Sequence, residues 1–83
     1  MSKSCGPLPL QRKWIDRELK GLKSSSRCGR KCRSQIQMSQ LHIRAYDSVT
    51  KKKGTKGCGE AAAELLNAAT SLGQATELWK QGK

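Results

Sequence analysis

The side chains with the clearest potential for chemistry are four cysteines and one histidine. Cys28 and Cys32 form a C-x3-C pair, whereas Cys5, Cys58 and His42 lie far from it along the chain. The C-x3-C spacing suits a zinc knuckle, and five candidate ligands exceed the four that a tetrahedral site needs. A convincing zinc site shows two such pairs, however, and this chain has one. We therefore predict no metal site and no cofactor, with a zinc-stabilised module as an alternative that chelators would unfold.

The expected state of these cysteines is the free thiol. The start of the chain, Met1–Pro7, has no apolar segment of the kind that forms a secretory signal peptide. This pattern predicts a reducing compartment, where thiols stay reduced. Cys28 and Cys32 would then be exposed, open to oxidation and able to pair with each other.

Catalytic patterns are absent from the sequence. His42 has no serine, cysteine or carboxylate at a recognisable motif spacing, and the acidic residues number only six. Gly54, Gly57 and Gly59 precede a predicted helix and lie beside Lys53 and Lys56, but they match no phosphate-binding glycine motif. We interpret them as a flexible turn, and we predict that the protein is not an enzyme.

Two clusters of basic residues predict binding to nucleic acid or another polyanion. The chain has 83 residues, with 17 Lys+Arg against 6 Asp+Glu and a net charge of +11. Such clusters displace counterions from phosphates without reading sequence, and they also resemble nuclear-import signals. Only three aromatic residues are available for base stacking, which argues against sequence-specific recognition. The predicted nucleic-acid-binding residues are Arg27, Arg30, Lys31, Arg33, Lys51, Lys52, Lys53 and Lys56.

Residues 9–23 are predicted to form an amphipathic helix. Leu8, Ile15, Leu19 and Leu22 fall within about 60° of one another in helical projection, and charged residues cover the opposite side. Such a helix, with Trp14 at the border of the stripe, suits an anionic membrane surface as well as a protein core. We favour packing inside the protein, because a second apolar stripe is available for it.

That second stripe lies in residues 60–80, which show the strongest helical pattern of the chain. Apolar residues recur at alternating spacings of four and three, which defines a heptad seam. Alanine favours helix formation and lets another helix approach closely. This seam, a candidate interface for a partner helix or for a second copy, consists of Ala61, Leu65, Ala68, Leu72, Ala75 and Trp79.

The middle of the chain, residues 24–59, is predicted to be basic and largely disordered. In residues 35–49 the apolar residues scatter around a helical projection and alternate with polar ones, which favours one or two short strands. Leu, Ile, Val and Phe number 13 of 83 residues, about 16 %, below the share expected of a highly charged folded chain.

Taken together, the sequence predicts a small, mainly α, partly disordered protein. Its expected organisation is a tail at 1–8, helices at 9–23 and 60–80 flanking the middle segment, and a tail at 81–83. The predicted function is non-enzymatic, non-specific binding of DNA or RNA, in the nucleus or alternatively the cytoplasm, without a membrane span. The alternative is an adaptor that docks through its C-terminal helix, and the composition also fits the product of a young or overprinted reading frame.

Overall fold

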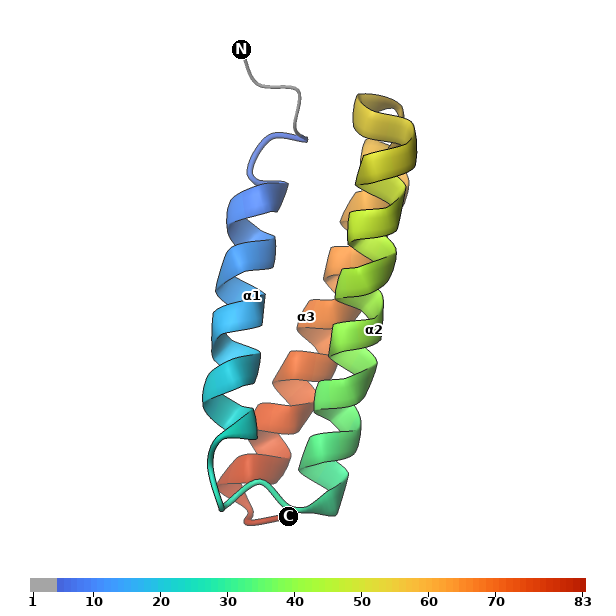
Figure 1. The fold of residues 1–83 in the computed structure, drawn as a ribbon. Helices are drawn as coiled ribbons and strands as arrows, with labels where there is room; N and C mark the ends of the chain where they lie inside the picture. Colours follow the sequence, from blue (N-terminus) through green and yellow to red (C-terminus); the bar gives the residue numbers. More distant parts are fainter. Residues whose placement is uncertain (1–4) are drawn as a thin grey trace.

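Three helices packed side by side make up residues 5–83, the part of the chain that the structure, a computed structural model, describes (Figure 1). α1 spans Leu8–Lys23, α2 spans Arg30–Lys53 and α3 spans Cys58–Lys80, and the short 3-10 helix η1 at Gly54–Gly57 joins the last two. The chain reverses direction after α1 and again after α2, so α2 is antiparallel to both other helices. The bundle measures 43 × 18 × 15 Å.

The two helices predicted from apolar spacing are confirmed as α1 and α3. Pro9 lies in the first turn of α1, where its missing N–H removes no helical hydrogen bond. Ile15 and Leu19 of α1 are buried, and they join one core cluster with the seam of α3. The apolar stripe of α1 therefore packs inside the protein, as expected from the presence of a second stripe.

The prediction of a disordered middle segment with short strands is wrong. Residues 30–53 form the longest helix, α2, and residues 5–83 contain no strand. The core side of α2 consists of residues spaced by four and three, which is itself a heptad pattern: Cys32, Ile36, Ser39, Ile43 and Tyr46. Two of the apolar residues that suggested strands, Met38 and Leu41, are exposed on the opposite side of this helix.

The main core lies between α2 and α3, whose two heptad patterns face each other. Ser39 and Ala68 meet at the centre, where the Ser39 hydroxyl donates a 2.7 Å hydrogen bond to the Ala68 carbonyl. His42 contacts Glu64 one turn further along, with 2.9 Å between Nδ1 and Oε1. Small residues at the contact let the two backbones approach closely, and the buried hydroxyl of Ser39 has a hydrogen-bond partner.

The expectation of free thiols is also wrong, because all four cysteines form disulfides. Cys5 is joined to Cys58, which fixes the segment before α1 to the first residue of α3. Cys28 is joined to Cys32 across the first turn of α2, and both residues are buried. Disulfides persist in oxidising compartments, so the four bonded cysteines disagree with the predicted reducing compartment.

The expected tails lie partly outside the described residues. Residues 1–4 are not described, whereas the disulfide of Cys5 and the start of α1 at Leu8 place the rest of the predicted N-terminal tail in the fold. At the other end, the Lys83 amide donates a 2.8 Å hydrogen bond to the Leu78 carbonyl. Within residues 5–83, no helix combines the length and apolarity needed to cross a membrane.

Candidate polyanion-binding face

α2 aligns several exposed cations along one side of the bundle. Arg44 lies two heptads after Arg30, and Lys51 lies one heptad after Arg44. The three side chains therefore project in nearly the same direction from the helix. Arg33 lies one turn after Arg30 on the same side. Lys23, at the end of α1, faces this side across the groove between α1 and α2. We call these five residues, Lys23, Arg30, Arg33, Arg44 and Lys51, the basic face.

The groove between α1 and α2 is hollowed beside the basic face. One hollow of about 310 Å³ is lined by Lys23, Arg33 and the amides of Gln37 and Gln40. An adjoining hollow of about 260 Å³ shares Lys23 and Gln40 and continues to Arg44. Amides and guanidinium groups are donors that suit phosphate oxygens, and both hollows are open to solvent.

The carboxylates nearest to this groove are already engaged. Arg12 of α1 binds Asp47 of α2 through two hydrogen bonds, each 2.8 Å long. The hydrogen bond to Asp47 raises the pKa of Arg12, so the guanidinium is charged at any physiological pH. Asp16 pairs with Lys20 at 3.2 Å. Because both acids are neutralised locally, the basic face keeps its positive potential.

Most cations in the described part of the chain, residues 5–83, form no ion pair with an acid. Among residues 5–83 five of the acids form ion pairs, and four Lys or Arg residues take part in them. The remaining twelve cations of the same residues are Lys13, Arg17, Lys23, Arg27, Arg30, Lys31, Arg33, Arg44, Lys51, Lys52, Lys56 and Lys83.

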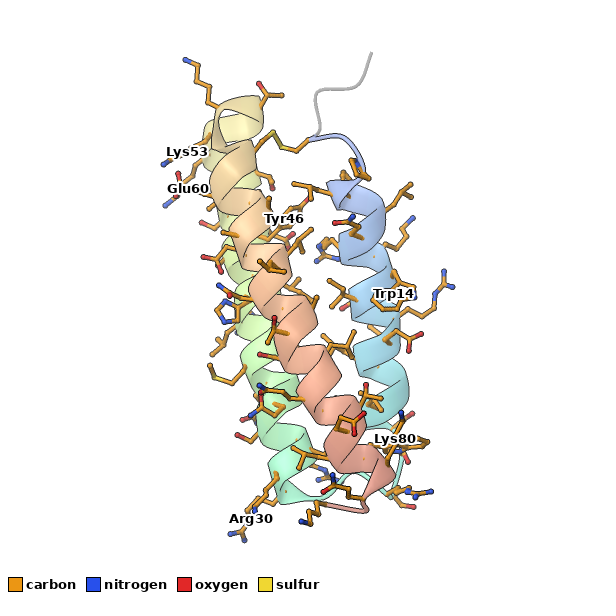
Figure 2. All side chains as sticks on the ribbon, turned by 180° about the vertical axis from the view of Figure 1, so that it is seen from behind. Trp14, Arg30, Tyr46, Lys53, Glu60 and Lys80 are labelled. Carbon is orange, nitrogen blue, oxygen red and sulfur yellow. A yellow bond between two sulfur atoms is a disulfide. The ribbon has the colours of Figure 1, made fainter. Side chains whose placement is uncertain are left out.

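The structure separates the predicted nucleic-acid-binding residues into two groups. Arg30, Arg33 and Lys51 belong to the basic face, although the two predicted clusters lie at opposite ends of α2 (Figure 2 labels Arg30 and Lys53). Lys31 points to a different side of α2, about 100° from Arg30 in projection. Lys52 follows Lys51 in the last turn of α2 and is exposed.

The other three predicted residues are placed away from the basic face. Arg27 lies 5.1 Å above the Trp79 ring and donates a 2.7 Å hydrogen bond to the Lys80 carbonyl, so it holds the α1–α2 loop to the end of α3. Lys53 is paired with Glu60. Lys56 lies in η1.

Two members of the basic face, Lys23 and Arg44, were not predicted from the sequence. Arg44 stands alone between the two clusters, so a search for local charge density does not find it. The available signal is the seven-residue spacing of Arg30, Gln37, Arg44 and Lys51, which becomes meaningful once residues 30–53 are recognised as a helix.

The residues predicted as a partner-helix interface face the inside of the bundle. Ala61, Leu65, Ala68, Leu72 and Ala75 are buried against α1 and α2 of the same chain. Trp79 is half-buried, and its ring N–H donates a 2.9 Å hydrogen bond to the Ser25 hydroxyl. The chain's own helices fill this seam, so the surface of residues 5–83 does not offer it to a second protein.

No group of three or more candidate metal ligands is found within residues 5–83. His42, the only histidine, is half-buried beside Glu64 and lies outside the basic face. No family model matches the chain, and comparisons with curated proteins and with solved structures give no match either.

Proposed function

We propose that this protein binds nucleic acid without sequence preference through the basic face. The observation that carries the proposal is the alignment of Arg30, Arg33, Arg44 and Lys51 along one side of a single helix, beside a groove whose acids are paired. Phosphates contacted by such a row release counterions, which drives binding with little dependence on base identity.

The dimensions of the basic face suit a short length of duplex. Arg30 and Lys51 are 21 residues apart in α2, which corresponds to about 30 Å along the helix axis. This length equals roughly nine base pairs at about 3.4 Å per pair. No aromatic residue belongs to the basic face, so base stacking adds nothing to its affinity for single strands. The proposal therefore favours duplex over single-stranded nucleic acid.

The test is a salt titration of binding to a labelled duplex of mixed sequence and to its single strands. We expect the logarithm of the affinity to fall linearly with the logarithm of the salt concentration, and each lost phosphate contact to reduce the slope by about 0.9. The variant Arg33→Gln/Arg44→Gln/Lys51→Gln should reduce the slope by about 2–3.

A matched control removes the same charge elsewhere. Lys31→Gln/Lys56→Gln/Lys83→Gln also deletes three cations, and it leaves the basic face intact. The control should reduce the slope by less than about 1, since its residues make no contact in the proposed complex. Equal losses in both variants would show that total charge, and not this face, controls binding. Affinity that is independent of salt would reject the proposal outright.

The compartment is a separate question, on which two predictions conflict. The basic clusters favour the nucleus, whereas the two disulfides favour an oxidising environment. Cell fractionation combined with alkylation of free thiols distinguishes them. A nuclear protein with alkylated cysteines would support the first prediction, and a protein that resists alkylation outside the nucleus would support the second.

A further inference from the structure

α1 has a second apolar surface, which the bundle leaves uncovered. Its inner stripe, with Ile15 and Leu19, is buried in the core. On its outer side, Leu10 is 72 % exposed and Trp14 is 53 % exposed, although both are large apolar residues. They are four residues apart and therefore adjacent on the helix surface. Figure 2 shows Trp14 on α1, outside the core that holds Tyr46.

Two cations lie beside this apolar pair. Lys13 and Arg17 are again four residues apart, and neither forms an ion pair within residues 5–83. One acid, Glu18, follows Trp14 by one turn and also has no ion-pair partner there. A tryptophan and a leucine flanked by long cationic side chains match the chemistry of an anionic lipid surface, where the indole ring lies among the headgroups.

We propose that α1 docks on anionic membrane surfaces through Leu10 and Trp14, with Lys13 and Arg17 contacting lipid phosphates. The protein lies on the bilayer and does not cross it, in line with the lack of a spanning helix among residues 5–83. Charge favours an anionic membrane over a second copy of the chain as the partner of this surface. Two molecules of net charge +11 repel each other, whereas an anionic membrane attracts both.

This surface is separate from the basic face. Three residues of the basic face, Lys23, Arg33 and Arg44, line the groove between α1 and α2. None of its five residues takes part in the membrane contact. The inference therefore does not depend on the proposed nucleic-acid binding, and variants of Leu10 and Trp14 should bind duplex as the unaltered protein does.

The experiment measures partitioning of the oxidised full chain onto vesicles of phosphatidylcholine with about 30 % phosphatidylglycerol, and onto pure phosphatidylcholine. We expect binding to the anionic vesicles, and at least about tenfold weaker binding of the variant Leu10→Gln/Trp14→Gln, because its apolar anchors are lost. The matched control Met38→Gln/Leu41→Gln removes two exposed apolar residues from α2, and its partitioning should change less than about twofold.

A gain-of-function variant tests the role of charge. Glu18→Gln removes the one acid beside Trp14, and it should strengthen binding to anionic vesicles about fivefold, since one charge near such a surface changes the affinity by about that factor. The same change should not affect binding to pure phosphatidylcholine.

Three results would overturn the inference. The first is an absence of binding to anionic vesicles, and the second is an equal loss in the Leu10/Trp14 variant and the Met38/Leu41 control. The third is a concentration-dependent dimer, seen by sedimentation, that Leu10→Gln/Trp14→Gln dissociates, because a second copy would then cover this surface.

Discussion

Ser39 lies at the centre of the α2–α3 contact, where a small side chain lets the two helices approach closely. Ser39 is fully buried, and its hydroxyl donates to the Ala68 carbonyl of the facing helix. A larger side chain at this position has no room, since the core is packed around a residue of serine's volume.

We expect Ser39→Ala to lower the free energy of unfolding by about 1 kcal/mol, because one hydrogen bond is lost. Ser39→Leu should lower it by roughly 1–3 kcal/mol, because the added carbons force the helices apart. Urea denaturation followed by circular dichroism measures both. Ser48→Ala, at an exposed position of the same helix, is the control and should change stability little. A Ser39→Leu protein as stable as the original would contradict this account of the contact.

Because of Tyr46, the stability of the fold should decrease at alkaline pH. Its side chain is buried, and this desolvation, with a smaller contribution from the charge of Asp47, raises the pKa of Tyr46 above its ordinary value of 10.0. In the unfolded chain the phenol loses its proton near pH 10, while the folded protein still holds it. Stability is therefore fully present below about pH 10 and is lost as the pH rises toward the pKa of the folded state.

The variant Tyr46→Phe isolates this effect, because phenylalanine cannot ionise. The difference in unfolding free energy between the two proteins should be constant from about pH 7 to 9.5, and should then shift in favour of the variant. Denaturant titrations at a series of pH values provide the measurement. A difference that stays constant up to about pH 11 would mean that burial does not disfavour the phenolate.

At the scale of the elements, replacing either of two glycines by alanine should change the stability in opposite directions. A Cβ atom on Gly57 would lie 2.7 Å from Val49 Cγ1 and 2.9 Å from Lys53 Cβ, so the turn between α2 and α3 requires glycine there. A Cβ on Gly73, inside α3, meets nothing within 4 Å. Glycine in a helix interior is less stable than alanine, since an unfolded chain with glycine has more conformational freedom to lose on folding.

We therefore expect Gly57→Ala to lower the melting temperature, with a loss of roughly 1–3 kcal/mol. Gly73→Ala should raise the melting temperature, with a gain of about 0.5–1 kcal/mol. Thermal unfolding monitored by circular dichroism compares the two, and each variant is the other's control for the added methyl group. The prediction fails if both changes have the same sign.

The disulfide between Cys5 and Cys58 holds α1 to the start of α3. It closes a loop with a sequence separation of 53 residues. A loop of that length restricts the unfolded chain enough to stabilise the fold by about 4 kcal/mol in the chain-entropy model.

The variant Cys5→Ser/Cys58→Ser should lose roughly 2–4 kcal/mol of unfolding free energy under oxidising conditions. Guanidinium denaturation with and without excess reductant gives the comparison. In reductant the original protein loses the same link, so the two proteins should become equally stable apart from the sulfur-to-oxygen change. If the two proteins still differ in unfolding free energy in reductant, the stabilisation comes from local packing of the cysteines and not from the disulfide.

How well each element could be predicted depended on which residues form its core side. α1 and α3 could be predicted, because leucine, isoleucine and alanine mark their buried sides in the heptad pattern. α2 could not, because its buried side includes Cys32, Ser39 and Tyr46, while the apolar Met38 and Leu41 are exposed. An apolar pattern identifies a buried side only when apolar residues occupy it.

The candidate site was predicted only in part, because charge density along the sequence does not show which side chains the fold brings together. Local charge density identified Arg30, Arg33 and Lys51, whereas Arg44 and Lys23 join them only through the helical geometry of α2 and the packing of α1. Charge density also selected Lys53, whose neighbour Glu60 is brought close by the turn between α2 and α3. Ion pairs between helices depend on the fold, and the sequence alone does not show them.

For the molecule as a whole, the low share of large aliphatic residues did not prevent folding. Alanine, serine and cysteine make up much of the buried interior, so the helices lie close together and need fewer large side chains. Two disulfides add stability that a core of this size supplies with difficulty. Composition alone predicted disorder because it counts residue types, and neither close approach nor covalent links enter such a count.

Repulsion among the cations should then be one of the forces that oppose this fold. The protein carries +11, and twelve cations of residues 5–83 have no acidic partner, so the folded state concentrates like charges. Salt weakens this repulsion as the screening length falls to about 8 Å near physiological ionic strength. We expect the melting temperature to rise by about 5 °C between low and physiological salt, corresponding to roughly 1 kcal/mol for a domain of this size.

The variant Arg33→Gln/Arg44→Gln/Lys51→Gln should show a smaller rise, because it removes three neighbouring cations from the basic face. Calorimetry of both proteins at several concentrations of sodium chloride measures the two dependences. A melting temperature that falls with salt would mean that ion pairs such as Arg12–Asp47 contribute more than the repulsion costs. Equal salt dependences in the two proteins would instead mean that the repulsion is distributed over the whole surface. The basic face would then carry no concentrated positive potential for a polyanion to neutralise.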